Sequence, residues 1–81
     1  MTGHPFTEED DMGIFRFVAS EAAAAVRCGK QVRVRGYKIW QKAEQQGIAR
    51  PHTFQSMRTR WRKSIEPHYI EFSRRLAEAK N

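Results

Sequence analysis

The sequence predicts an all-α fold, a three-helix helix-turn-helix bundle followed by an additional C-terminal helix. Two observations favour it. Apolar residues recur at helical spacings in separate segments, and glycine or proline stands between those segments, where helices end. The chain has 81 residues, 40% of them hydrophobic, a size that makes one domain with its own packed core. We expect a single domain over residues 1–81, with the core bundle at about residues 5–66 and the C-terminal helix at about residues 67–80.

The first helix is expected to begin at Thr7, which is followed by four acidic residues. The hydroxyl of Thr7 and the carboxylate of Asp10 have the spacing that satisfies free amides at a positive helix end. Gly29 is expected to end this helix after about 20 residues. Residues 29–36 then form a loop, in which Val32 and Val34 alternate as a short extended segment would. The apolar stripe of the first helix consists of Ile14, Phe15, Phe17, Val18, Ala22 and Val26.

The two helices of the helix-turn-helix are expected at Tyr37–Gln46 and Phe54–Ile65, joined by the turn 47–51. Thr53 is the expected cap of the second of them. At about 100° per residue, its apolar side chains share one face and the opposite face is polar, without an acid. The side chains expected in the core are Ile39, Trp40 and Ala43 from one helix, and Phe54, Met57, Trp61 and Ile65 from the other.

Pro67 is expected to end or kink the third helix, and it suits the first position of the C-terminal helix. In that last helix, Tyr69, Phe72 and Leu76 form a further apolar stripe. We expect this stripe to cover the core of the same domain; the alternative is a docking surface for a partner.

Positive charge is concentrated in the middle of the chain. The sequence has 15 Lys and Arg against 9 Asp and Glu, a net charge of +6. Ten of the basic residues lie between Gly29 and Lys63, where Glu44 is the single acid. Such a segment is typical of proteins that bind a polyanion, most often nucleic acid. The alternative is a basic surface that is simply solvated.

Enzymatic and membrane functions receive no support from the sequence. The three histidines are not paired at metal-binding spacing, no second cysteine accompanies Cys28, and no glycine-rich phosphate loop is present. A lone cysteine forms no internal disulfide, which fits a reducing compartment. No apolar run approaches the roughly 20 residues of a membrane helix. We expect no catalytic residue, no metal, no cofactor and no membrane partner.

Several motifs resemble a known family of domains. The segment Phe6-Thr7-Glu8-Glu9-Asp10 resembles the opening of a Myb repeat, in which an aromatic residue precedes Thr-x-Glu-Glu-Asp. Trp40 and Trp61 fall where the second and third Myb aromatics belong. The resemblance implies a Myb/homeodomain-like (SANT) fold with a structural aromatic core of Phe6, Trp40 and Trp61. It also implies that Arg60 pairs with Glu9 or another acid of the first helix.

A closer resemblance is to the Myb-like domain of the repressor-activator telomere proteins. It rests on the segments 6–11, 36–40 and 52–60, and it covers about Pro5 to Tyr69. The sequence departs from related patterns at Phe6, which replaces the usual tryptophan. It departs again at Thr59, which stands where the telomere repeat-binding factors carry an acid that reads bases. The base preference of those factors is therefore not carried over.

The resemblance and the charge together predict a nuclear, chromosomal, telomere-associated module that docks its third helix in the major groove of double-stranded DNA. Telomeric repeats are the candidate sequences, and other telomere proteins are expected partners of the parent chain. The side chains expected at base edges are Gln55, Ser56, Arg58 and Thr59. Those expected at the DNA backbone are Lys30, Arg33, Arg35, Lys38, Lys42, Arg62 and Lys63.

A protein–protein interaction module of a telomeric complex, with little or no DNA binding, is the alternative function. Some members of the resembled family use this domain against protein, and those tend to lack a basic third helix. Here the third helix carries four basic residues and no acid, which favours DNA.

Overall fold

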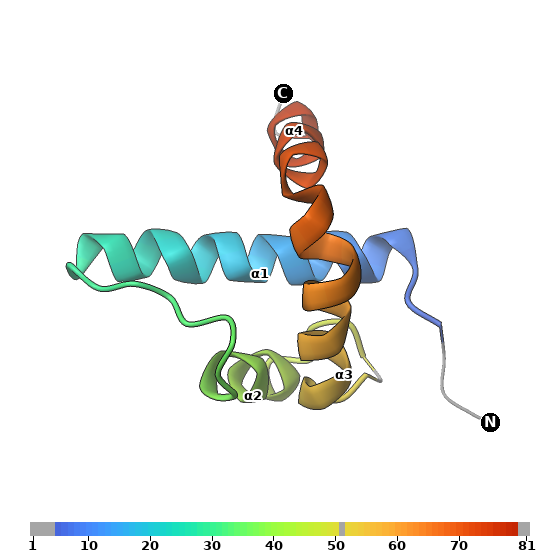
Figure 1. Ribbon diagram of the computed structural model, residues 1–81, viewed down its shortest axis with the longest axis horizontal. Coiled ribbons are helices and arrows are strands. Elements are labelled where there is room, and N and C mark those ends of the chain that lie inside the picture. Colours follow the sequence, from blue (N-terminus) through green and yellow to red (C-terminus); the bar gives the residue numbers. More distant parts are fainter. Residues whose placement is uncertain (1–4, 51, 80–81) are drawn as a thin grey trace.

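The computed structural model describes residues 5–50 and 52–79, and every regular element in this part of the chain is helical. The four α-helices are α1 (Glu8–Arg27), α2 (Lys38–Gln45), α3 (Phe54–Arg60) and α4 (Tyr69–Ala79). Figure 1 shows α2 and α3 on one side of α1, while the chain that continues from α3 crosses α1 and ends in α4 on the other side. The expected all-α bundle with an additional C-terminal helix is confirmed.

The first helix begins with the expected cap. The Thr7 hydroxyl accepts a hydrogen bond from the Asp10 amide at 3.1 Å, and the Asp10 carboxylate accepts one from the Thr7 amide at 3.0 Å. This reciprocal pair satisfies two amides that the helix itself leaves free. At the other end, Gly29 takes a positive φ of 70°, a conformation that glycine adopts without steric cost. Local sequence chemistry therefore accounts for both ends of α1.

Only the first half of the apolar stripe on α1 is covered by other elements. Ile14, Phe15, Phe17 and Val18 are buried. Val26 lies on the same stripe, as expected, but it is 74% exposed, so the stripe is not buried over its whole length. The reason is that α1 extends past the helices that pack on it, so nothing covers its last turn (Figure 1).

The two tryptophans lie next to each other in the core. Trp40 and Trp61 are both buried, and their ring centroids are 6.0 Å apart. Phe15 stacks on Trp61 from α1, with centroids 6.2 Å apart. Phe6, the third aromatic of the expected triad, is half-buried. Its ring stacks on the ring of His52, with centroids 3.7 Å apart, rather than on a tryptophan. Because Phe6 precedes the helix cap, it lies at the edge of the core, and Phe15 is the α1 aromatic that reaches Trp61.

The indole of Trp40 ties the long loop to the bundle. Its Nε1–H donates a hydrogen bond of 2.8 Å to the carbonyl of Val34. Val32 and Val34 are half-buried against the core, although they form no strand. The loop that carries several of the basic residues is thus fixed to the bundle by one part-buried hydrogen bond and two half-buried valines.

The chain from α3 to α4 follows one helical path with changing turn width. Trp61–Ile65 is a π-helical turn, in which the Glu66 amide donates to the Trp61 carbonyl, and Glu66–His68 is a 3₁₀ turn. Pro67 has no N–H to donate and crowds the carbonyl four residues earlier, so an undisturbed α-helix cannot continue there. In α4, Phe72 is buried and Leu76 packs against the core, so two residues of the last stripe cover this domain as expected. The third, Tyr69, contacts Phe15 but is 56% exposed.

The stability of the domain should depend on Trp40. Replacing Trp40 by Ala removes a fully buried indole and its hydrogen bond, so we expect a loss of about 3–5 kcal/mol in the free energy of unfolding. That is a large part of the roughly 5–15 kcal/mol that a domain of this kind has. The matched control is Val26→Ala at the uncovered end of α1, which should change stability by less than about 0.5 kcal/mol. Urea unfolding measures both, and a Trp40→Ala protein that unfolds at the wild-type midpoint would contradict the core described above.

Candidate nucleic-acid interface

The helix-turn-helix unit consists of α2, the turn 46–53 and α3. Gly47 has a φ of 76° and Ala49 a φ of 52°, so the turn passes twice through the left-handed region. Thr53 caps α3 by accepting a hydrogen bond of 3.2 Å from the Ser56 amide. Its hydroxyl also donates to the Ser56 hydroxyl oxygen at 3.1 Å. The start of α3 is therefore set by local contacts, as the sequence predicted; Pro51 lies outside the described residues.

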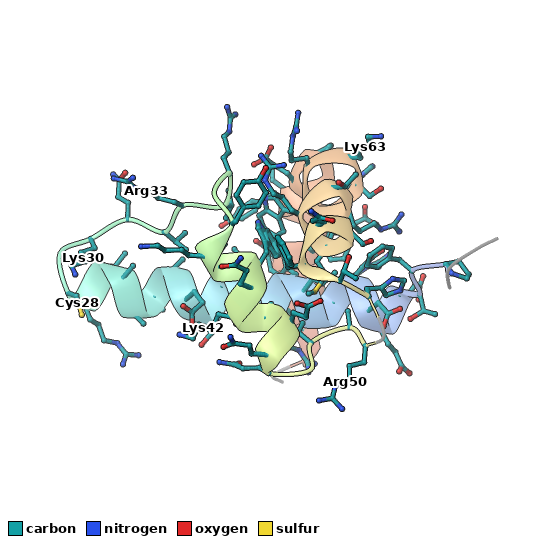
Figure 2. The ribbon with its side chains drawn as sticks, turned by 90° about the horizontal axis from the view of Figure 1, so that it is seen from below. Cys28, Lys30, Arg33, Lys42, Arg50 and Lys63 are labelled. Atoms are coloured by element: carbon teal, nitrogen blue, oxygen red, sulfur yellow. The ribbon has the colours of Figure 1, made fainter. Side chains whose placement is uncertain are left out.

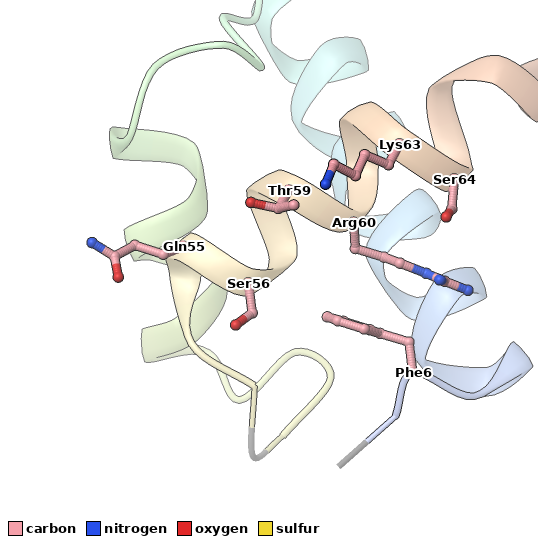
Figure 3. Close-up of a pocket in the computed structure, with 7 residues that line it drawn as sticks. All are labelled: Phe6, Gln55, Ser56, Thr59, Arg60, Lys63 and Ser64. Carbon is pink, nitrogen blue, oxygen red and sulfur yellow. The ribbon is translucent and has the colours of Figure 1, made fainter. Parts of the chain in front are cut away.

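The helical segment 54–65 has a buried face and an exposed polar face. Met57, Trp61 and Ile65 point into the core. The opposite face carries exposed side chains that include three of the four expected base contacts and two of the expected backbone contacts: Gln55, Ser56, Thr59, Arg62 and Lys63. We call these five residues the α3 face. A depression of about 420 Å³ is lined by four of these residues, all except Arg62, and it reaches Phe6 (Figure 3).

Arg60 lines the edge of this depression next to Phe6, and its guanidinium binds α1 (Figure 3). Its Nε and Nη2 donate to the two carboxylate oxygens of Asp11 at 2.8 Å and 2.7 Å, and its guanidinium lies 5.3 Å from the centre of the Phe6 ring. The hydrogen bond with Asp11 raises the pKa of Arg60 above its ordinary value, partial burial opposes this rise, and the charge of Asp11 adds to it. Arg60 thus pairs with an acid of the first helix as expected, and that acid is Asp11 rather than Glu9.

One signal in the sequence points to Asp11. This acid lies three, four and seven positions before Ile14, Phe15 and Val18, so it occupies the apolar stripe of α1. An acid on a core-facing stripe requires a cationic partner from another element, because burying an unpaired carboxylate is unfavourable. Asp11 is indeed 8% exposed.

Arg58 is turned toward the loop that precedes α2. Its Nε donates a hydrogen bond of 3.0 Å to the carbonyl of Arg35, and its guanidinium lies 4.9 Å from the centre of the Tyr37 ring. The side chain is half-buried. Of the four expected base contacts, Arg58 is the one that the structure does not bring to the α3 face. Both partners, the Arg35 carbonyl and the Tyr37 ring, lie more than twenty residues earlier in the sequence, so the local sequence pattern did not predict them.

The remaining basic residues lie on two sides of the domain. Lys30, Arg33, Arg35 and Lys38 are exposed on the loop and at the start of α2. In Figure 2, Arg33 and Lys63 lie on one side, whereas Lys42 and Arg50 point to the other. Lys42 also forms an ion pair of 2.9 Å with Glu21 of α1. The structure therefore does not gather Lys42 with the other expected backbone contacts.

The ion pair of Arg60 should stabilise the fold rather than bind a ligand. Arg60→Ala leaves the carboxylate of Asp11 buried without its partner, so we expect a loss of about 1.5–3 kcal/mol in the free energy of unfolding. Because folding raises the pKa of Arg60, this stabilisation is present at neutral pH, and on the basic side it is lost as the pH rises through that raised value. The matched control is Arg62→Ala, an exposed arginine on the same helical segment, with an expected change within about 0.5 kcal/mol. Equal unfolding midpoints for the two variants would show that the Asp11 pair contributes nothing.

Residues 5–50 and 52–79 carry neither a metal-ligand cluster nor a membrane-spanning helix. No group of three potential metal ligands occurs among them, and none of their helices is long and apolar enough to span a membrane.

The comparison with protein families agrees with this geometry. Residues 6–71 match the family model of the Rap1 Myb domain. No curated protein and no solved structure gives a significant match. The matched range begins at Phe6, includes α1, α2 and α3, and ends in the first turn of α4. The chain therefore belongs to the Rap1 Myb domain family, the Myb-like domains of the Rap1 telomere proteins.

Proposed function

We propose that this domain binds double-stranded DNA and places the α3 face in the major groove. The observation that carries the proposal is the α3 face itself: polar and basic side chains, no acid, on the second helix of a helix-turn-helix unit. In such units this helix enters the major groove, while basic residues around it hold the backbone. Four acids lie instead in the first turn of α1, where Asp10 completes the cap and Asp11 pairs with Arg60.

The two ends of the α3 face have different roles in this proposal. Gln55, Ser56 and Thr59 lie in the N-terminal part, which such helices present to base edges; glutamine suits adenine, and hydroxyls suit several bases. Arg62 and Lys63 lie about a turn later and meet phosphates. The exposed cations of the loop and of the start of α2 extend the phosphate contacts: Lys30, Arg33, Arg35 and Lys38.

Family membership supports the setting of this function. The Rap1 Myb domain is a module of telomere proteins and is not a known enzyme family. We accordingly propose a nuclear location at chromosome ends, telomeric repeats as the DNA, and other telomere proteins as partners of the parent chain.

A protein partner is the second candidate, favoured by one apolar region near α4. Ile70 is 75% exposed and Tyr69 is 56% exposed. Beside Tyr69 lies an apolar depression of about 240 Å³ between α1 and the loop, with Trp61 in its wall. This region lies apart from the α3 face, so one titration distinguishes the two functions.

The deciding experiment is an NMR titration of the domain with a telomere-repeat duplex and a scrambled duplex of equal length. DNA binding predicts that the amide signals of residues 54–63 and of the loop before α2 shift most. With the telomeric duplex, these shifts should be larger or should saturate at a lower DNA concentration than with the scrambled duplex. Equal shifts with both duplexes would indicate electrostatic binding without sequence preference. No shifts at low salt would overturn the proposal and favour the protein partner.

The affinity for duplex DNA should depend steeply on salt. If the basic middle of the chain meets phosphates, the logarithm of the association constant should fall with the logarithm of salt concentration at a slope of about −0.9 per neutralised phosphate, for about four to six phosphates. Fluorescence anisotropy at several salt concentrations gives this slope. An affinity independent of salt would contradict the assignment of these residues to the DNA backbone.

Gln55 and Lys63 should respond differently to replacement by Ala. Gln55→Ala should weaken binding to a preferred site by about 1–3 kcal/mol and leave random DNA nearly unchanged, because it removes a base contact. Lys63→Ala should weaken both alike and make the salt slope shallower by about one unit. Arg50→Ala is the matched control: it removes one positive charge from the opposite side of the domain (Figure 2) and should leave both affinities nearly unchanged. If Arg50→Ala has the effect of Lys63→Ala, net charge rather than the α3 face determines binding.

A further inference from the structure

We propose that Arg35, Arg58 and Arg62 form one anion-binding cleft that holds a single phosphate of the DNA backbone, with Glu66 at its rim as an acid that weakens the site. The inference rests on the proposed DNA binding and names one phosphate contact within it. It also assigns Arg58 to the backbone rather than to a base edge.

The three arginines come from separate elements and line the same depression. Arg35 lies on the loop before α2, Arg58 on α3 and Arg62 on the π-helical turn, and together with Glu66 they line a depression of about 420 Å³. Arg58 and Arg62 are four residues apart on one helical path, a spacing that makes their side chains neighbours, and both line this depression at the edge of the α3 face. The depression is separate from the one along the α3 face, whose lining includes none of these four residues.

Arg58 is held in place before any ligand arrives. Its Nε bond to the Arg35 carbonyl and its position over the Tyr37 ring restrict both the stem and the plane of the guanidinium. The N–H groups on its terminal nitrogens remain as donors, in the planar fork that matches phosphate oxygens. A side chain restrained in this way loses less conformational freedom when it binds. The same restraints turn it away from the α3 face, where base edges would lie.

The charges in the cleft also favour an anion. Three guanidinium groups and one carboxylate give the lining a formal charge of +2. Among the ion pairs of the described residues, none involves any of these three arginines. Like charges that share one depression repel each other, and a phosphate placed between them removes that repulsion while it accepts charge-assisted hydrogen bonds.

Glu66 is the one acid that lines the cleft, and it allows the cleft to be distinguished experimentally from a general basic surface. A carboxylate beside the phosphate repels it, so Glu66→Gln should tighten binding, whereas removal of an acid remote from the DNA should have little effect. Glu78, exposed near the end of α4, provides that remote control. The cleft thus predicts that replacing one of the three arginines weakens phosphate binding, whereas Glu66→Gln strengthens it.

The first test uses inorganic phosphate and the wild-type domain, so it does not depend on DNA binding. We expect the side-chain Nε–H signals of Arg35, Arg58 and Arg62 to shift with one common saturation curve at low salt. Glu66→Gln should shift this curve to lower phosphate concentration. Arg75, which pairs with Glu71 on α4 at 3.1 Å, is the control arginine and should not follow it. Shifts that differ among the three arginines, or that Arg75 shares, would overturn the cleft.

The second test counts phosphates with duplex DNA. If the three arginines share one phosphate, the variant with Arg35, Arg58 and Arg62 all replaced by Ala should have a salt slope shallower by about 0.9, whereas separate phosphates would make it shallower by about 2.7. Arg58→Ala alone should weaken specific and random duplexes alike, by about tenfold. Glu66→Gln should strengthen both, and Glu78→Gln should change neither.

The outcomes separate this inference from the function on which it rests. If the wild-type domain binds no duplex, the proposed function is wrong, and the phosphate titration still decides the cleft. If the domain binds DNA but Arg58→Ala weakens the preferred site alone, Arg58 reads a base, so the cleft is wrong and the function stands. Unfolding curves identify a variant that fails to fold; Arg62→Ala, which removes an exposed side chain, then serves for the same comparison of specific and random duplexes.

Discussion

The ion pair between Asp11 and Arg60 determines which way the third helix faces. Successive residues of an α-helix point about 100° apart, so fixing a few side chains fixes the rotation of them all. Arg60 is bound to α1, and Met57, Trp61 and Ile65 are buried. Thr59, Arg62 and Lys63 then point to solvent, whereas Arg58 lies against the loop. A charge pair inside the domain thus determines which residues are offered to the outside.

A second constraint acts on the loop that returns from the end of α1. Basic residues in a free loop would spread their charge over many positions. Here the Trp40 indole donates a hydrogen bond to the Val34 carbonyl, and Arg58 donates one to the Arg35 carbonyl. The loop is therefore bound both to α2 and to α3. This double attachment is what brings cations that lie more than twenty residues apart in the sequence to one side of the domain.

Local chemistry in the sequence predicted most of the fold. Thr7 and Thr53 cap their helices, Gly29 ends α1, and the buried faces of α2 and α3 follow helical periodicity, because each depends on residues within about two turns. The incorrect predictions concern side chains whose burial and contacts depend on packing between elements that are distant in the sequence. Val26 fits the stripe, yet no element reaches it, and Phe6 occupies a family position while Phe15 contacts Trp61. For the candidate site, helical periodicity predicted which residues form the α3 face. It did not predict the orientation of Arg58 or the ion pair of Lys42, because the partners of both residues come from other parts of the chain.

The continuous helical path from α3 to α4 has a structural consequence. No flexible linker separates the two helices; the π-helical turn, the 3₁₀ turn around Pro67 and α4 follow one another without interruption. His68 Nδ1 lies 2.9 Å from the Ser64 carbonyl, a contact that bridges the change in turn width. The exposed Ile70 on α4 is therefore connected to α3 by consecutive helical turns rather than by an extended segment. A partner that contacts α4 would therefore touch the same helical path that carries the α3 face.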